Sequence, residues 1–210
     1  YDWDFACADL ASQAPWWEVG AQSGYHAITQ GYLIGEVVRR ITGRSFGTYF
    51  KEQVAEQVGA DFHIGVDPKH FDRIADLVAA KNVAPIMAMD PDSIPGRVFG
   101  GLNISPESTG TAEWRQAEIP AANGHGNARS IVRAQTAMAN NGRAFGQTLF
   151  SPNVVKRALQ TQVEGVDLVL GLSVQFAMGY AKPTPDIPMS PNANSLWWGG
   201  AGGSTVCVDT

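Results

Sequence analysis

The sequence predicts an α+β protein in which a helical lobe precedes the strands of a sheet. Apolar residues recur at helical spacing over about the first 160 residues, whereas residues 166–209 are rich in β-branched and aromatic side chains punctuated by glycine. Hydrophobic residues make up 44% of the 210 residues, which is enough to form a core. We therefore expect one domain over residues 1–210, with a helical lobe and irregular segments at about 1–160 and strands at about 161–210.

The first predicted element is a helix from about His26 to Thr42. Arg39 and Arg40 suit the negative end of its dipole, and Gly43 stands where a helix is stopped. An amphipathic helix is indicated by apolar side chains that recur at helical spacing, namely Ile34, Val37, Val38 and Ile41.

A second helix is predicted from Phe46, with Ser45 as its N-cap and Gly59 as its terminator. Together with the first helix it forms a predicted helical hairpin. One apolar face of the second helix is formed by Phe46, Phe50, Val54 and Val58.

The remaining elements are predicted from the positions of proline and glycine and from local composition. Residues 60–127 carry many prolines and glycines, which predicts irregular chain with short helices. A helix from about residue 128 ends at Asn140-Asn141-Gly142, and Ser151-Pro152 opens another that runs to about Gln160, with Ser151 as N-cap. Strands are predicted within residues 166–175, 195–199 and 204–209.

Charge and composition exclude several kinds of partner. The sequence has 15 Lys and Arg residues against 20 Asp and Glu, and the positive residues are scattered, so the basic patch expected of a nucleic-acid-binding protein is absent. No apolar run approaches the roughly 18 residues that span a bilayer. Cys7 and Cys207 lie far apart without a C-x-x-C pair, which predicts neither a zinc site nor a disulfide framework. These features slightly favour the cytoplasm as the compartment without determining it. They do not determine the oligomeric state.

One short motif competes for the role of nucleophile. Gly43-Arg44-Ser45-Phe46-Gly47 matches G-x-S-x-G, the nucleophile elbow of α/β-hydrolases, which would make Ser45 the reactive serine. An elbow follows a buried strand, whereas the residues before Ser45 have a helical period. We therefore interpret Ser45 as a helix cap and keep the elbow as the alternative.

Three segments carry a resemblance to a known family. Gly24-Tyr25-His26-Ala27-Ile28-Thr29 runs into a helix that ends in T-G-x-S, residues 123–133 read N-G-H-G-N-A-R-S-I-V-R, and residues 198–203 read W-G-G-A-G-G. In this order they resemble the second motif, the glycine-rich turn and the third motif of serine hydrolases of the β-lactamase and penicillin-binding-protein superfamily. The similarity is to the carboxylesterase branch, the class C β-lactamase-like esterases.

The resemblance implies a β-lactamase/transpeptidase-like fold, with a helical lobe and part of an antiparallel sheet. We also expect the chain to be truncated at both ends, because it opens at Tyr1 without an initiator Met and stops in a β-rich run, residues 204–210, with no following element. No S-x-x-K nucleophile motif occurs in these residues. In the family that motif precedes the tyrosine motif, so we expect it upstream of Tyr1. The 210 residues alone are expected to be inactive.

Site residues follow from the same resemblance. It implies that Tyr25 is the general base and that the backbone N–H of Ala201 binds the oxyanion, while Trp198, Gly199 and Gly200 contact substrate. A phenol titrates near pH 10, so a base role requires a nearby cation such as the motif lysine. The alternatives are that Tyr25 only packs at the helix start and that the glycines form an ordinary turn.

His125, between two glycines, is a candidate for the wall of the acyl or alcohol pocket. The alternative is a turn histidine bonded to nearby backbone. Together with His26, His63 and His70 it shows no metal-ligand spacing, so we expect neither a metal nor another cofactor.

The third motif selects a substrate class. β-Lactamases usually carry Lys or His where this chain has Trp198, and commonly Asn where it has Ala27. An indole carries no charge and cannot form a salt bridge to a lactam carboxylate. We therefore expect a small-molecule ester substrate and acyl-enzyme chemistry. The alternatives are a β-lactamase or D-Ala peptidase of the same fold, or a non-catalytic binding or scaffold module if the upstream segment lacks S-x-x-K.

Overall fold

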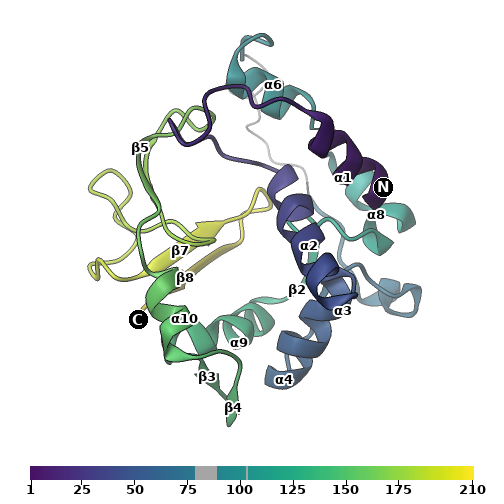
Figure 1. Cartoon of the computed structure of the whole chain (residues 1–210). Helices are drawn as coiled ribbons and strands as arrows, with labels where there is room; N and C mark the ends of the chain where they lie inside the picture. Colours follow the sequence, from purple (N-terminus) through teal and green to yellow (C-terminus); the bar gives the residue numbers. More distant parts are fainter. Residues whose placement is uncertain (79–88, 103) are drawn as a thin grey trace.

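The computed structural model describes residues 1–78, 89–102 and 104–210. The first helices and the last strands of the chain occupy different sides of the molecule (Figure 1), which agrees with the predicted α+β arrangement. On one side lie the helices α1 (Trp3–Ser12), α2 (Thr29–Thr42), α3 (Phe46–Phe50) and α4 (Glu56–Val58). On the other lie the strands β5 (Val163–Val166), β6 (Ser173–Phe176), β7 (Leu196–Gly199) and β8 (Thr205–Val208).

Both helices of the predicted hairpin form, and the first of them starts later than predicted. Helix α2 begins at Thr29 rather than near His26, and it ends as predicted at Gly43, which adopts a left-handed φ of 68°. The second helix is continuous through α3, a π-helical turn η1 (Lys51–Ala55) and α4, and it stops as predicted at Gly59 with φ 63°. Glycine tolerates such angles because it has no Cβ.

The apolar stripe of α2 faces outward in this structure. Ile34 is 51% exposed, Val37 56% and Ile41 78%, although the apolar face of an amphipathic helix normally packs on a core. The buried positions of α2 are instead Gly31 and Gly35. Three of the four stripe residues are therefore at least half exposed in the described structure, whereas Val38 is partly buried.

Ser45 caps a helix, as predicted. Its hydroxyl accepts a hydrogen bond from the Thr48 N–H at 3.3 Å and donates to a carboxylate oxygen of Glu118 at 2.6 Å. The other Glu118 oxygen accepts from the Gly47 N–H at 2.7 Å. A Cβ on Gly47 would come within 2.1 Å of the Ile64 carbonyl oxygen, so this close approach accounts for the second glycine of the G-x-S-x-G match.

Replacing Ser45 with alanine is expected to lower the free energy of unfolding by about 0.5–2 kcal/mol, because the cap of α3 is lost. Esterase activity of the full-length protein should survive. The matched control is Ser151→Ala, since Ser151 also occupies an N-cap position but its side chain makes no cap hydrogen bond. Urea unfolding of both variants measures the difference, and loss of all turnover in folded Ser45→Ala protein would restore the elbow hypothesis.

Helix α1 was not predicted from the sequence. Its N-terminal signal is Asp2, whose carboxylate accepts a hydrogen bond from the Phe5 N–H at 2.9 Å. Trp3, Ala6, Cys7 and Leu10 recur at helical spacing and are the partly buried residues of α1, so this apolar face was an available signal that went unused.

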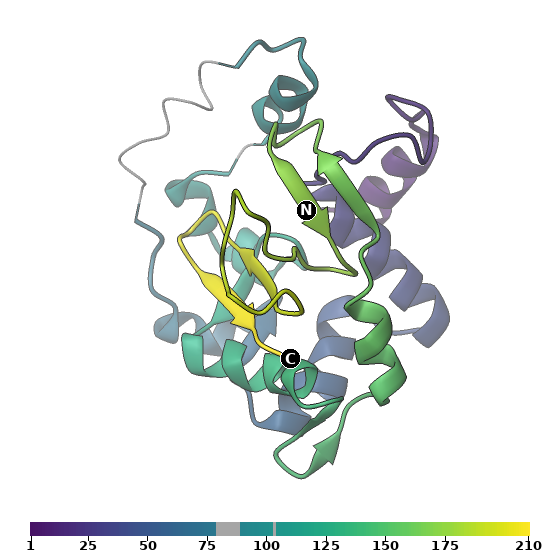
Figure 2. The same cartoon turned by 90° about the vertical axis from the view of Figure 1, so that its left-hand side faces the viewer.

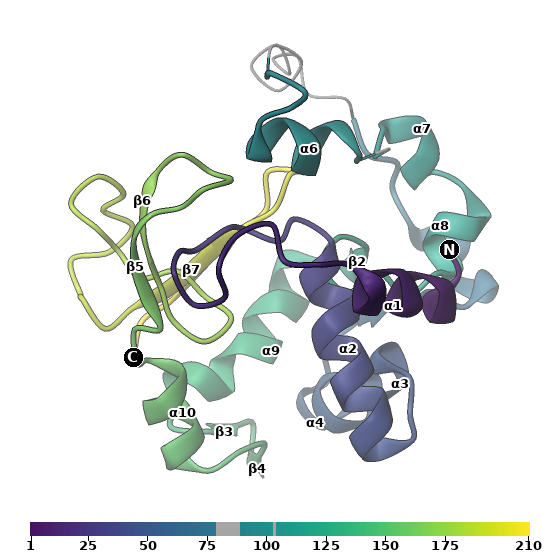
Figure 3. The same ribbon diagram turned by 45° about the horizontal axis from the view of Figure 1, so that its top comes forward.

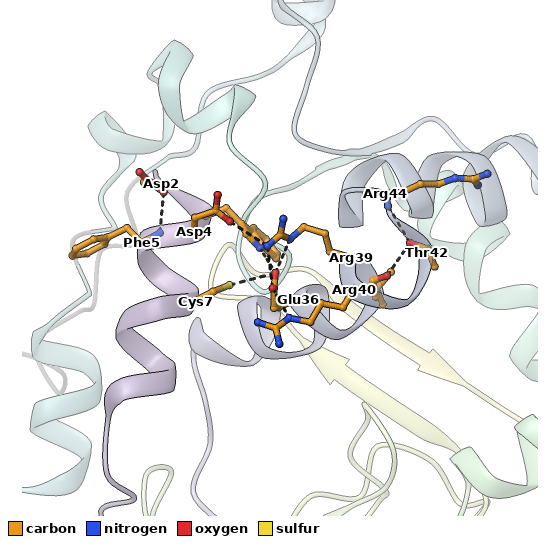
Figure 4. A network of polar contacts seen from close by, with 11 residues as sticks. Asp2, Asp4, Phe5, Cys7, Glu36, Arg39, Arg40, Thr42 and Arg44 are labelled. Atoms are coloured by element: carbon orange, nitrogen blue, oxygen red, sulfur yellow. Dashed lines mark hydrogen bonds and ion pairs between the residues drawn. The ribbon is translucent and has the colours of Figure 1, made fainter.

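A polar cluster attaches α1 to α2 (Figure 4). The Glu36 carboxylate accepts hydrogen bonds from the Trp3 indole at 2.9 Å and from the guanidinium groups of Arg39 and Arg40 at 2.7 and 2.8 Å. The bonds from Arg39, Trp3 and Arg40 hold the pKa of Glu36 far below its usual value. Glu36 is therefore charged at neutral pH and holds α1 in place.

The segment 60–127 is irregular with short helices, as predicted, apart from residues 79–88 and 103, which lie outside the described residues. An unpredicted two-stranded ladder pairs β1 (Phe62–Ile64) with β2 (Gly124–Gly126). Between them lie the 3-10 helix η2 (Pro68–Arg73) and the helices α6 (Ile94–Gly100), α7 (Pro106–Thr109) and α8 (Ala112–Gln116).

Helix α9 (Ala128–Ala139) lies between the strands and the helices α2 to α4 (Figure 3). It ends at Asn140, as predicted, and the short hairpin of β3 (Arg143–Ala144) and β4 (Gln147–Thr148) follows. Helix α10 (Pro152–Ala158) starts at the predicted proline and ends two residues before Gln160. Two core clusters meet on α9. It contributes Met138 to a cluster with Val155, Ala158, Ala177, Leu196 and Val208, and Ala137 to a cluster with Val58 and Ala144.

The strands form two antiparallel hairpins, β5–β6 and β7–β8, that lie side by side (Figure 2). Ala181 links them through single bridges to Phe176 and Trp197. The strand predicted within 166–175 is confirmed at Ser173–Gln175, which belong to β6, but the chain turns between Val166 and Ser173 around the buried carboxylate of Asp167. The predictions at 195–199 and 204–209 are confirmed. No helix in the described parts of the chain has the length and apolar character needed to cross a membrane.

Candidate active site

Tyr25 and Trp198 meet although they are far apart in the sequence. Tyr25 lies on the loop before α2 and Trp198 on β7, and their ring centroids are 5.3 Å apart with planes inclined by 45°. The Tyr25 loop therefore lies against the strand that carries Trp198.

The loop before α2 is shaped by Gly24. A Cβ on this residue would come within 2.3 Å of the Trp17 ring. The Trp17 indole N–H in turn donates to the Gln22 carbonyl at 3.1 Å. Trp17 thus closes the loop on itself, and only glycine fits beneath its ring.

Trp198 is surrounded by aromatic rings. Besides Tyr25, it packs against Phe176 at 5.5 Å and Trp197 at 5.6 Å between centroids. These contacts fix the indole by packing, so the third-motif position offers a flat apolar surface without charge.

A cavity of about 230 Å³ lies beside Trp198. Its apolar wall comprises Leu170, Leu172, Val174, Ala181, Ile187, Trp197, Trp198 and Gly199, and its polar residues are Gln175, Lys182 and Thr184. Lys182 was not singled out from the sequence, where an isolated A-K-P segment gives no signal. Among the described residues no carboxylate forms an ion pair with its ammonium group.

The third-motif glycines lead into the β7–β8 turn. Gly199 ends β7 and lines the cavity, and the Gly200 N–H donates to the Ser204 carbonyl at 2.8 Å. Ala201 is exposed in the turn, and within the described residues its N–H donates to no backbone carbonyl. That donor is open to another acceptor. The interpretation of these residues as a turn is correct, and it is compatible with the oxyanion role.

His125 lies on β2, opposite His63 of β1, rather than in a turn. It is not among the residues that line the cavity beside Trp198. Burial lowers the pKa of its imidazole, although a hydrogen bond with the Asn123 backbone opposes this effect. The structure thus does not bring His125 to the cavity beside Trp198, and among the described residues its buried Nδ1 has no hydrogen-bond partner. In the described parts of the chain, no three His, Cys, Asp or Glu residues are grouped so that they could hold a metal ion.

Asp167 is a second residue that the sequence analysis missed. It lies in the β5–β6 turn with no exposed surface, and its carboxylate receives hydrogen bonds from the Ser23 hydroxyl and the Tyr25 N–H at 2.7 and 3.0 Å. Burial opposes ionisation, but bonds from Leu170, Ser23, Tyr25 and Val169 outweigh it and lower the pKa of the carboxyl. A lone acid within the apolar run V-D-L-V-L was the available signal.

Comparison with known proteins places this site in a family. A sequence model of the beta-lactamase family matches residues 1–210. The chain belongs to the beta-lactamase family. Among curated beta-lactamase-family relatives, "Esterase/beta-lactamase LipL" of Mycobacterium tuberculosis is 29% identical over 182 residues, which cover 81% of this chain and 42% of that protein.

Solved structures agree with the family and the fold. A crystal structure of a family VIII carboxylesterase has a TM-score of 0.85 and 31% identity, covering 100% of this chain and 55% of its own. A penicillin-binding-protein homologue from Caulobacter crescentus has a TM-score of 0.80 and 35% identity, covering 99% and 55%. The β-lactamase/transpeptidase-like fold is thus confirmed, and the chain spans about half the length of the beta-lactamase-family proteins it matches.

Proposed function

We propose that the full-length protein is a serine hydrolase of carboxylic esters, with its S-x-x-K nucleophile motif outside these 210 residues. The observation that carries the proposal is the contact of the Tyr25 ring with Trp198, which brings the second motif to the third. Relatives described as an esterase/beta-lactamase and as a carboxylesterase support the same reaction class.

In the proposed reaction the serine hydroxyl attacks the ester carbonyl while Tyr25, as phenolate, takes its proton. The developing oxyanion accepts a hydrogen bond from the Ala201 N–H, which is open in this structure. The alcohol leaves with a proton returned by Tyr25, and water then releases the acid from the acyl-enzyme. The apolar wall beside Trp198 suits an uncharged acyl or alcohol group.

A β-lactamase is the second candidate, because one observation favours it. Lys182 lines the cavity next to Trp198 and has no described carboxylate partner, so it offers a cation that could receive a lactam carboxylate. Trp198 itself provides no such charge, and this absence is why we place ester hydrolysis first.

Labelling of the full-length protein with a fluorophosphonate tests the nucleophile. The serine oxygen displaces fluoride from phosphorus and gives one covalent adduct, which peptide mass spectrometry should locate on the serine of S-x-x-K. Ser45→Ala protein should be labelled to the same extent. A label on Ser45 would support the elbow instead, and a folded protein with neither label nor turnover would support a non-catalytic module.

A further inference from the structure

The Asp167 carboxylate is completely enclosed by hydrogen-bond donors. One oxygen accepts from the backbone N–H groups of Tyr25, Val169 and Leu170 at 3.0, 2.9 and 2.9 Å. The other accepts from the Ser23 hydroxyl at 2.7 Å. A buried charge is costly unless its hydrogen bonds are complete, and here the two oxygens have four donors.

These donors belong to two segments that are far apart in the sequence. Val169 and Leu170 lie in the β5–β6 turn that contains Asp167, whereas Ser23 and Tyr25 lie on the loop before α2. A further bond, from the Leu168 N–H to the Ser23 carbonyl at 2.8 Å, joins the same two segments. The carboxylate therefore holds the Tyr25 loop against the turn.

The turn also forms part of the cavity wall. Leu170 and Leu172 both line the cavity beside Trp198. The Leu170 N–H donates a hydrogen bond to the Asp167 carboxylate, and the Leu172 carbonyl accepts one from the Asp167 N–H at 3.0 Å. The Asp167 side chain thus bonds both to the backbone of Tyr25 and to the backbone of the cavity wall. An apolar residue of similar size at position 167 would leave the Tyr25 N–H without its acceptor.

We infer that Asp167 is a positioning residue, which fixes the backbone of Tyr25 so that its ring stays beside Trp198 and the cavity. The inference rests on the proposed function, in which Tyr25 is the general base. Asp167 itself touches no reacting atom, and it acts through Tyr25.

Kinetics of the full-length protein test this inference. Asp167→Ala should lower kcat for a p-nitrophenyl ester about a hundredfold, because a base displaced by about 1 Å loses that much. Asp167→Asn should lose less, since its remaining oxygen can accept the three N–H groups and its amide can donate to Ser23. Exposed Asp186 provides the control, and Asp186→Ala should change kcat less than about twofold.

A double-mutant cycle separates positioning from general structural damage. In a Tyr25→Phe background, Asp167→Ala should change the residual rate by no more than about twofold, because the group through which it acts is gone. An equal loss in both backgrounds would overturn the inference. If Asp167→Ala does not fold, Asp167→Asn and Ser23→Ala are carried through the same cycle, with the same expected and contrary results.

Amide hydrogen exchange tests the attachment without any activity. In Asp167→Ala or Ser23→Ala protein, exchange at the Tyr25 N–H should be about tenfold to a hundredfold faster, while amides in the middle of α9 keep the wild-type rate. Unchanged exchange at Tyr25 in both variants would refute the attachment. Normal ester hydrolysis by Tyr25→Phe would instead refute the proposed function and leave the exchange result standing.

Discussion

Replacing Tyr25 with phenylalanine in the full-length protein is expected to lower kcat/KM for a p-nitrophenyl ester about a hundredfold to ten-thousandfold, the usual contribution of a general base. The phenolic oxygen is the proposed proton acceptor. Among residues 1–78, 89–102 and 104–210, none forms a side-chain hydrogen bond with the Tyr25 hydroxyl, so its removal leaves no buried partner unsatisfied. The ring and its packing on Trp198 are kept, and the melting temperature should therefore change little.

A matched control is Tyr32→Phe. Tyr32 also packs its ring on a tryptophan, with 5.0 Å between its centroid and that of Trp3, but it lies on α2 next to α1. This variant should retain wild-type kcat/KM. Near-normal hydrolysis by Tyr25→Phe would remove Tyr25 from the mechanism, and an equal loss in both variants would indicate a general effect of removing a tyrosine hydroxyl.

Local signals predicted the helix ends well. Gly43 and Gly59 adopt left-handed angles that other residues rarely tolerate, and Ser45 satisfies an N–H that the helix leaves free, so both kinds of signal depend only on neighbouring backbone. For the same reason Pro152 marked the start of α10. Such predictions hold whatever the rest of the fold does.

Local sequence patterns could not predict contacts between residues that are far apart in the chain. The turn at Asp167 was predicted as strand, because V-D-L-V-L has strand-like composition and the donors that stabilise the turn include Ser23 and Tyr25, far away in the chain. Only the family resemblance assigned Tyr25 and Trp198 to one site, since no periodicity relates the two, and their contact is seen only in the structure. Lys182 gave no signal, because its place beside Trp198 results from the Ala181 bridge between the hairpins.

The charge of Lys182 bears on which substrates the cavity beside Trp198 can bind. Trp198, which the family resemblance aligns with the usual cation position, packs against Tyr25, Phe176 and Trp197. Lys182 reaches the same cavity from the segment after β6, with its own N–H bonded to the Gln175 carbonyl at 2.8 Å. A pair of substrates that differ only in one carboxylate distinguishes the two environments.

The full-length protein is expected to hydrolyse p-nitrophenyl esters of short or medium acyl chains and to turn over a chromogenic cephalosporin weakly or not at all. The cephalosporin and its methyl ester, which lacks the carboxylate charge, should have similar kcat/KM, because no cation occupies the position of Trp198. A site that binds the carboxylate would prefer the free acid about tenfold to a hundredfold, the usual value of a hydrogen bond to a charged group. Steady-state kinetics on wild type and Lys182→Met decide the matter: efficient turnover of the free acid would contradict ester specificity, and loss of that preference in Lys182→Met would identify Lys182 as the cation.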